Sequence, residues 1–143
     1  MIEMGPVSIA RVAVEQHDAL QDPWELGMTL AILSASVRPA LIVEIGSLHG
    51  GSLWAWRMTG AEVIGVTAQE PVEFTSHGAR MIWGDSTKLN TQRDLREALN
   101  GREPDFMFLD GDHSRASAAN DWDLARLLGA RVVGFHDIRH PNH

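Results

Sequence analysis

The sequence predicts an α/β fold in which one parallel β-sheet is covered by helices on both faces. Five short apolar stretches rich in branched residues alternate with longer stretches of helical character. Strands that alternate with helices form right-handed crossovers and therefore run parallel. The first apolar stretch leads into a glycine-rich turn. We expect one domain over residues 1–143, with N-terminal helices in residues 1–38 and the sheet in residues 40–138.

The composition excludes several classes of partner. The formal net charge is −7 over 143 residues, which argues against nucleic acid and anionic membranes, because both bind basic surfaces. The chain has no cysteine, so it lacks disulfides and thiolate metal clusters, and this fits a reducing compartment. No leader-like segment and no membrane-length apolar run is present. We therefore expect a soluble, cytoplasmic protein.

Two helices are predicted before the first strand. Residues 6–20 form the first. Asp22 is suited to cap the second, with Pro23 at its first position and Glu25 completing a box-like pair. This helix is expected to end before Pro39 and to pack on the sheet, because apolar residues recur on one face. They are Leu26, Leu30, Leu33 and Val37.

The stretch LIVEIGSLHGGSL organises the chain. Leu41–Ile45 is too short for a helix and predicts a strand that is buried on both faces. Gly46 is able to adopt the positive φ of a sharp turn, and Gly50 and Gly51 leave the backbone open to close approach. A helix over residues 52–59 points its free N–H groups at the same spot, as in nucleotide-type cradles. The alternative is that these glycines serve only tight helix–sheet packing.

Glu44 is the unusual residue of the first strand. An acid in an otherwise apolar strand destabilises the fold unless it is paired. We therefore expect Glu44 either to cap loop N–H groups or to contact a ligand. The strict GxGxxG pattern of dinucleotide-binding folds is absent, because residues 47–49 lack the glycine that this spacing requires.

Four more strands are expected after this turn. A polar connection over residues 68–78 is long enough to form a lid or a ligand-facing loop. One helix is expected between the third and fourth strands, and another between the fourth and fifth. The four strands are residues 62–67, 80–83, 105–110 and 131–136.

Local signals set the expected bounds of these two helices. Thr91, with Asp94 three residues later, predicts a capped helix start, and Asn100-Gly101 predicts its end. The last helix is expected to run to about residue 128, with Gly129 beyond its end. Its buried side is expected to carry Trp122, Ala125 and Leu128.

The carboxyl ends of the predicted strands carry chemically active residues. In parallel sheets ligands bind outside these ends, near the point where the strand order reverses. We therefore expect the following residues to face one crevice: Gly46, Thr67, Asp85, Asp110, His136 and Asp137.

Four motifs in order carry a resemblance to a known family. They are QDPWEL with ALIVEIGSLHGGSL, then WGDS, then FMFLDGDHS with DWDLARLL, and finally VVGFHDI. Together they resemble class I S-adenosylmethionine-dependent methyltransferases over residues 21–138. More narrowly, they are similar to the small-molecule O-methyltransferase branch that includes cephalosporin-hydroxylase-like and macrolide-sugar enzymes. The resemblance implies a Rossmann-like, doubly wound sheet of order 3-2-1-4-5, here truncated after the fifth strand.

The resemblance also implies a cofactor site. Glu44, Gly46 and Gly50 would border the methionine part of the cofactor, and Asp85 with Ser86 would lie at the adenine. The family usually has an acid at the end of the second strand for the ribose hydroxyls. Here Thr67 stands there and forms weaker hydrogen bonds, so either affinity is reduced or Glu70 takes over. The full implied set is Glu44, Gly46, Ser47, Gly50, Thr67, Asp85, Ser86 and Asp110.

Related members that bind a divalent metal imply a second set of ligands. The matching positions are Asp110, His136 and Asp137, with Asp112 as a substitute candidate. Oxygen ligands suit Mg²⁺, whereas a histidine shifts preference toward Mn²⁺, Fe²⁺ or Zn²⁺. The alternative is that Asp110 and Asp112 only cap loop N–H groups.

The expected function is methyl transfer from S-adenosylmethionine to a hydroxyl of a small molecule, with metal assistance left open. Without a metal, His113 or His136 is the candidate base, since imidazole titrates nearest neutrality. One alternative is a non-catalytic binder, favoured by Thr67 and the early stop. Another is a nicotinamide-dependent reductase, disfavoured by the missing GxGxxG and the absence of tyrosine.

Self-association is expected at the fifth strand. The family fold continues beyond this point with a helix and an antiparallel pair, whereas this chain stops shortly after it. An uncovered strand edge is normally protected in proteins. We therefore expect a homo-oligomer formed through the fifth-strand edge, or a truncated relative.

Overall fold

One sheet of five parallel strands forms the centre of the protein, and its order is β3-β2-β1-β4-β5. The computed structural model describes residues 4–17, 19, 21–47, 50–68, 74–110 and 115–136. The predicted fold class and strand order are confirmed. The strands are β1 Leu41–Ile45, β2 Glu62–Thr67, β3 Arg80–Trp83, β4 Phe106–Leu109 and β5 Val132–Phe135.

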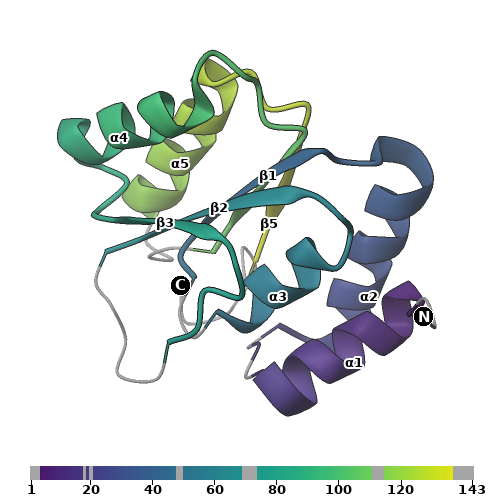
Figure 1. Cartoon of the computed structure of the whole chain (residues 1–143). Helices are drawn as coiled ribbons and strands as arrows, with labels where there is room; N and C mark the ends of the chain where they lie inside the picture. The colour runs from purple at the N-terminus through teal and green to yellow at the C-terminus, as the bar shows by residue number, and fades with distance from the viewer. Residues whose placement is uncertain are drawn as a thin grey trace.

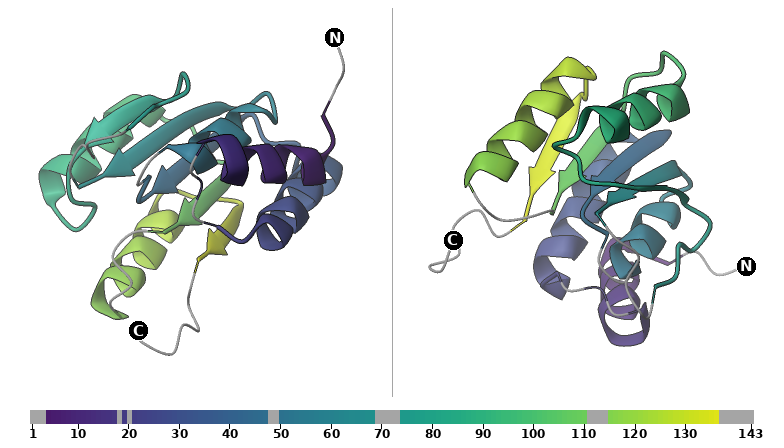
Figure 2. Two further views of the ribbon diagram at one scale, coloured as in Figure 1. Left: turned by 90° about the horizontal axis from the view of Figure 1, so that it is seen from below. Right: turned by 90° about the vertical axis from the view of Figure 1, so that its left-hand side faces the viewer.

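Helices cover both faces of the sheet (Figures 1 and 2). One face carries α1, α2 and α3, and the other carries α4 and α5. Successive strand residues point to opposite faces, so Ile42 packs with the first layer and Val43 with the second. The helices are α1 Pro6–His17, α2 Pro23–Ile32, α3 Gly51–Arg57, α4 Leu89–Leu99 and α5 Arg115–Leu127.

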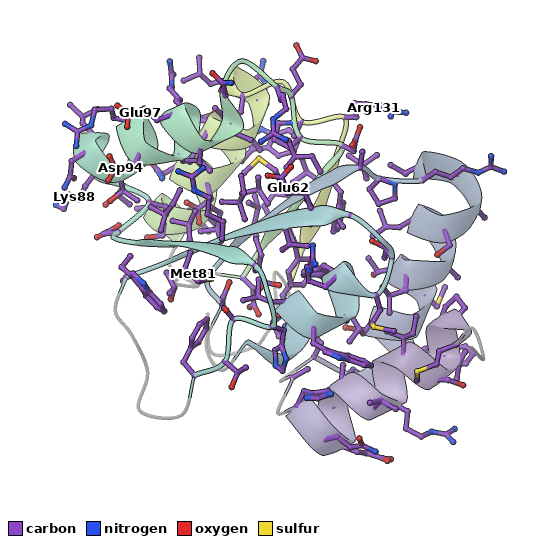
Figure 3. All side chains as sticks on the ribbon, in the orientation of Figure 1. Glu62, Met81, Lys88, Asp94, Glu97 and Arg131 are labelled. Atoms are coloured by element: carbon purple, nitrogen blue, oxygen red, sulfur yellow. The ribbon has the colours of Figure 1, made fainter. Side chains whose placement is uncertain are left out.

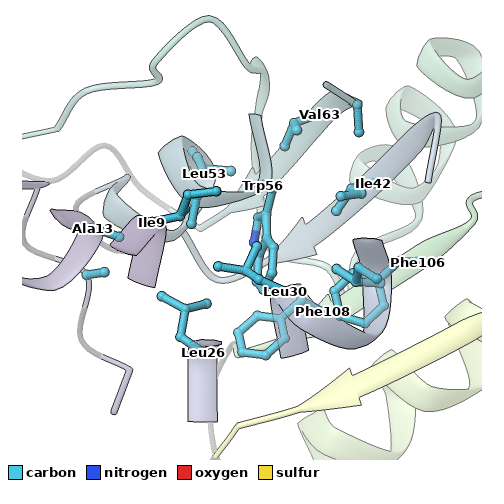
Figure 4. Packing of buried hydrophobic residues seen from close by; sticks show 14 of the residues in the cluster. Ile9, Ala13, Leu26, Leu30, Ile42, Leu53, Trp56, Val63, Phe106 and Phe108 are labelled. Atoms are coloured by element: carbon cyan, nitrogen blue, oxygen red, sulfur yellow. The ribbon is translucent and has the colours of Figure 1, made fainter. Parts of the chain in front are cut away.

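An aromatic cluster fills the core beneath the first helical layer (Figure 4). The Trp56 ring of α3 lies 5.4 Å from the Phe106 ring and 5.2 Å from the Phe108 ring, measured between centroids. Trp56 is fully buried. Aromatic pairs at such separations stabilise a core beyond the area that they bury, so this cluster fixes α3 against β4.

The start of α2 follows the sequence prediction. Oδ1 of Asp22 accepts hydrogen bonds from the backbone N–H groups of Trp24, at 2.8 Å, and Glu25, at 3.2 Å. The predicted apolar face is buried at Leu26, Leu30 and Leu33. The helix continues as a π-helical turn over Leu33–Val37, and Arg38 closes it in a left-handed conformation. The first helix, in contrast, ends at His17 rather than at residue 20.

The predicted start of α4 is wrong. The helix begins at Leu89, and no side-chain hydrogen bond caps it at Lys88. Thr91 lies inside the helix and is buried, because it packs closely over Gly84. The position of Thr91 is therefore determined by its contact with Gly84 at the end of β3, and not by a capping pair with Asp94. The predicted end is correct, since Asn100 and Gly101 both have positive φ.

The predicted buried face of α5 is only partly right. Ala125 is buried, but Trp122 is 42% exposed and its ring lies over Phe135. The residues turned toward the sheet include Asp121 and Leu124. Asp121 is held there by a hydrogen bond from the Ser86 hydroxyl, at 2.7 Å, and this contact sets which side of the helix faces inward.

Charged side chains gather on the outer surface and at the amino ends of the strands. Lys88, Asp94 and Glu97 lie along the outer side of α4 (Figure 3). At the amino ends, Oδ2 of Asp105 accepts from the N–H groups of Ala40, at 2.8 Å, and Leu41, at 3.0 Å. These contacts tie the amino ends of the strands together, so the opposite edge is left for function.

Candidate functional site

The carboxyl ends of the strands meet at one edge of the sheet. The N–H of Gly46 donates to Val66 O at 2.7 Å, and that of Asp110 donates to Ile45 O at 2.8 Å. The N–H of His136 donates to Leu109 O at 3.2 Å. The ladder therefore extends one residue past these strands. This places Gly46, Asp110 and His136 at one edge, as the sequence predicted, while their roles in binding stay predictions.

Asp110 joins β4, β5 and the segment before α2. Its Oδ1 lies 2.8 Å from Nδ1 of His136, and its Oδ2 accepts from Nε2 of Gln21 at 3.0 Å. The side chains of His136 and Asp110 are only 13% and 12% exposed. A carboxylate at Nδ1 holds the ring proton there, which makes Nε2 the basic nitrogen of the neutral imidazole. The pair therefore has the arrangement of an oriented general base.

Gln21 is a neighbour of Asp110 that was not among the predicted site residues. It is 7% exposed. Its Nε2 contacts Asp110, whereas its Oε1 is buried without a hydrogen-bond partner. Its partner lies 89 positions away, so no local pattern points to it.

Glu44 is completely buried. Its Oε1 accepts from the Ser52 hydroxyl at 2.8 Å, and its Oε2 accepts from the Trp56 indole N–H at 2.6 Å. The expected capping of loop N–H groups is therefore wrong, because both donors are side chains of α3. Burial raises the pKa of Glu44 from 4.5 to about 7, although the bonds from Ser52 and Trp56 oppose the rise and nearby Asp110 adds to it.

The glycines of the turn have different roles. Gly46 has φ 92° and Gly50 has φ 86°, so the left-handed turn expected at Gly46 is confirmed. A Cβ on Gly50 would lie 1.8 Å from Thr75 O, and one on Gly51 would lie 2.3 Å from His17 O. The protein's own backbone thus packs against Gly50 and Gly51, but it comes from Thr75 and the end of α1 rather than from the helix–sheet packing of the stated alternative.

The segment that follows β3 carries the predicted adenine residues. Oδ1 of Asp85 accepts from the N–H of Thr87, at 2.8 Å, and from its hydroxyl, at 2.7 Å. These bonds lower the pKa of Asp85, which is exposed. The Ser86 hydroxyl proton is used by buried Asp121. Of this pair, Asp85 is the one whose polar group faces solvent.

Two more predicted cofactor residues lie at the neighbouring strand ends. Thr67 ends β2 and is half-buried. The Ser47 hydroxyl follows the Gly46 turn and is buried beside Glu44, whose pKa it helps to lower. Several predicted residues lie outside the described residues, and their predictions stand untested. They are Glu70, Asp112, His113 and Asp137.

Within the described part of the chain the donors do not assemble a metal centre. No group of three or more histidine, aspartate or glutamate residues converges there. Asp110 and His136 bind each other, and Gln21 occupies the second oxygen of Asp110. A cation at Asp110 would therefore have to replace contacts that already exist. The predicted metal site stays a prediction. None of the helices described has the length and apolar character needed to cross a membrane.

No protein-family model matches the sequence, and neither does any curated protein. The fold, however, is similar to solved structures. The MycE methyltransferase from the mycinamycin biosynthetic pathway, in complex with Mg and SAH, aligns with a TM-score of 0.68 at 14% identity, over 89% of this chain and 37% of MycE. MycE with Mg, SAH and mycinamycin VI aligns at 0.66 and 13% identity, over 88% and 36% of the two chains.

A third similar structure is that of cofactor-bound Rv0187 from MTB. It aligns with a TM-score of 0.53 at 19% identity, over 90% of this chain and 62% of Rv0187. The chain thus spans little more than a third of the length of MycE. At these identities the likeness establishes the fold.

Proposed function

We propose that this chain, which has the Rossmann-like fold of S-adenosylmethionine-dependent methyltransferases, transfers a methyl group from S-adenosylmethionine to a hydroxyl of a small molecule. The observation that carries the proposal is the Asp110–His136 pair at the edge where the Gly46 turn also lies. In parallel α/β sheets this edge is where ligands bind. The SAH present in both MycE structures supports the choice of cofactor.

The residues at this edge fit such a cofactor. One buried polar atom, Oε1 of Gln21, has no hydrogen-bond partner among the described residues, and buried polar groups normally have one. The exposed carboxylate of Asp85 is suited to accept from an exocyclic amine. Of the predicted cofactor set, the proposal keeps Gly46, Ser47, Thr67, Asp85, Ser86 and Asp110, with Gln21 added to it. Glu44 and Gly50 instead contact the protein's own α3 side chains and Thr75 backbone.

The protein's part in the reaction is to align the reactants and to accept a proton. When bound, S-adenosylmethionine supplies an electrophilic methyl group on a sulfonium sulfur. Nε2 of His136 takes the proton of the attacking hydroxyl, and Asp110 stabilises the resulting imidazolium through Nδ1. Alignment of two reactants in one site contributes about 7–11 kcal/mol to such a reaction. His113 remains the other candidate base.

Metal assistance is the alternative form of this proposal. The Mg in both MycE structures supports it, whereas the mutual bond between Asp110 and His136 favours the metal-free form. Chelation separates the two. In the metal-free form EDTA leaves the rate unchanged, while a loss of activity that Mg²⁺ restores shows that a metal is needed, with Asp110, His136 and Asp137 as its predicted ligands.

A non-catalytic binder is the second candidate function. Thr67 favours it, because a neutral hydroxyl stands at the tip of β2 where the resemblance predicts an acid. A binder retains affinity for S-adenosylhomocysteine and shows no turnover on any hydroxyl-bearing compound.

We also propose that two copies pair through β5. Within the described residues, Val132–Phe135 forms a sheet edge with a neighbour, β4, on one side only. Such edges readily pair with another strand. Light scattering should report a dimer, and a monomer at all concentrations would contradict this. A cytoplasmic location also stays a proposal, supported by the lack of cysteine.

Calorimetry tests the proposed function. S-adenosylhomocysteine and S-adenosylmethionine are titrated into the protein, with NAD as the comparison ligand. The proposal expects both sulfur compounds to bind and NAD not to. If neither sulfur compound binds at millimolar concentration, the proposal fails, and NAD binding alone would favour a reductase.

A further inference from the structure

We infer that Gln21 binds ligand directly, and that its side-chain carbonyl accepts a hydrogen bond from the ammonium group of the cofactor's methionine part. This inference rests on the proposed function and adds to it a residue from the N-terminal segment. Gln21 is buried, with 7% of its surface exposed. One end of its carboxamide is bonded and the other is not.

The bond to Asp110 determines the orientation of the Gln21 carboxamide. Nε2 of Gln21 lies 3.0 Å from Oδ2 of Asp110. The reversed amide would put a carbonyl oxygen against a carboxylate oxygen, with no proton between two acceptors. The carbonyl must therefore point away from Asp110, and there it meets no donor among the residues that the structure describes.

The backbone beside Gln21 is fixed in place. Asp22, the next residue, caps α2 through the N–H groups of Trp24 and Glu25. Its carbonyl also accepts from the N–H of Leu26 at 2.9 Å. The first turn of a packed helix therefore holds the backbone of this segment, and the bond to Asp110 holds the amide end of the Gln21 side chain.

The surroundings favour a cationic donor. Asp110 carries a carboxylate at the edge, and its charge raises the pKa of nearby Glu44, so the local potential is negative. S-adenosylmethionine offers three kinds of donor: a neutral adenine amine, neutral ribose hydroxyls and one α-ammonium. The ammonium is the donor that the negative potential attracts, and charged hydrogen bonds are the stronger ones.

A thermodynamic cycle tests this assignment. The affinities of S-adenosylhomocysteine and its deamino analogue are measured by calorimetry on the wild type and on Gln21→Met, which keeps the shape but has neither amide atom. Gln16→Met, on the exposed side of α1, is the matched control. The deamino analogue removes the amine from the ligand and needs no change in the protein. The two ligand affinities can therefore be compared on the wild type even if the variant folds poorly.

We expect the wild type to prefer the amine-bearing ligand by about tenfold or more. In Gln21→Met this preference should fall by about threefold or more, because one acceptor is lost while the Asp110 charge remains, and Gln16→Met should keep it. An equal preference in the wild type and Gln21→Met overturns the inference and indicates a buried water or a structural role only. If the wild type binds neither ligand, the proposed function itself fails, and that result is distinct from the loss of the preference.

Discussion

The indole N–H of Trp56 donates to Oε2 of Glu44 across 2.6 Å, and both side chains are completely buried. This bond joins the end of β1 to α3 directly behind the Gly46 turn. A buried carboxylate without its donors would destabilise the fold strongly. The turn at the candidate site is therefore held from inside the protein.

Replacing Trp56 with phenylalanine removes this donor and keeps most of the ring volume. We expect the free energy of unfolding to fall by about 2–4 kcal/mol, from the lost bond and the smaller ring. Urea denaturation measures it. Trp122→Phe is the control, because that ring is 42% exposed and its change should cost much less. Equal losses in the two variants would contradict the role given to the Trp56 N–H.

The pH dependence of stability should carry a contribution from Glu44. Its pKa is about 7 in the folded chain against an ordinary 4.5, so between these values the folded state binds more protons than the unfolded state. The free energy of unfolding then decreases as pH rises from 4.5 to 7 and levels off above it, by about 3 kcal/mol in total.

Comparison of the wild type with Glu44→Gln isolates this contribution. The difference in unfolding free energy between the two proteins, measured in urea from pH 4 to 8, should follow the same curve. A difference that is independent of pH would mean that Glu44 titrates near its ordinary value.

Gly50 and Gly60 form a matched pair for a test of packing. Both have positive φ, 86° and 87°. A Cβ would lie 1.8 Å from Thr75 O at Gly50, whereas at Gly60 nothing lies within 4 Å. Gly60→Ala should cost only the left-handed strain, about 1–2 kcal/mol. We expect Gly50→Ala to cost clearly more, as measured by thermal unfolding, and similar losses would contradict the close packing against Thr75.

Substitutions in the Asp110–His136 pair should lower kcat, and this effect can be measured separately from the affinity for S-adenosylhomocysteine. Asp110→Asn keeps the side-chain shape but no longer stabilises an imidazolium. We expect kcat to fall by about a hundredfold or more in Asp110→Asn and in His136→Gln. For His136→Gln, the affinity for S-adenosylhomocysteine should stay within about threefold, because the base is not expected to hold the cofactor. If His136→Gln retains full activity, His113 becomes the candidate base.

Much of the fold was predictable from local patterns. The first three strands match their predicted bounds, because each is an apolar run bordered by glycine, proline or polar residues. Thr91 shows the limit of such patterns. Its spacing to Asp94 suggested a cap, but packing over Gly84 decided its place.

The site was predictable only where it follows from strand order. The carboxyl ends meet at one edge in any parallel sheet, so Gly46, Asp110 and His136 were expected to be neighbours. Gln21 was not, since its partner is distant in sequence. A glycine-rich sequence also does not show whether a ligand or the protein's own backbone packs against the glycines. The backbone of residue 75 packs against Gly50, and that of residue 17 packs against Gly51.

The central claim is that the cofactor lies over the carboxyl ends of β1, β3 and β4. Amide NMR of the ¹⁵N-labelled chain, titrated with S-adenosylhomocysteine, tests it most directly. We expect saturable shifts at Gly46, Asp85 and Asp110, with none on the outer side of α4 at Arg96. Shifts confined to other parts of the chain, or no shifts at millimolar ligand, would contradict it.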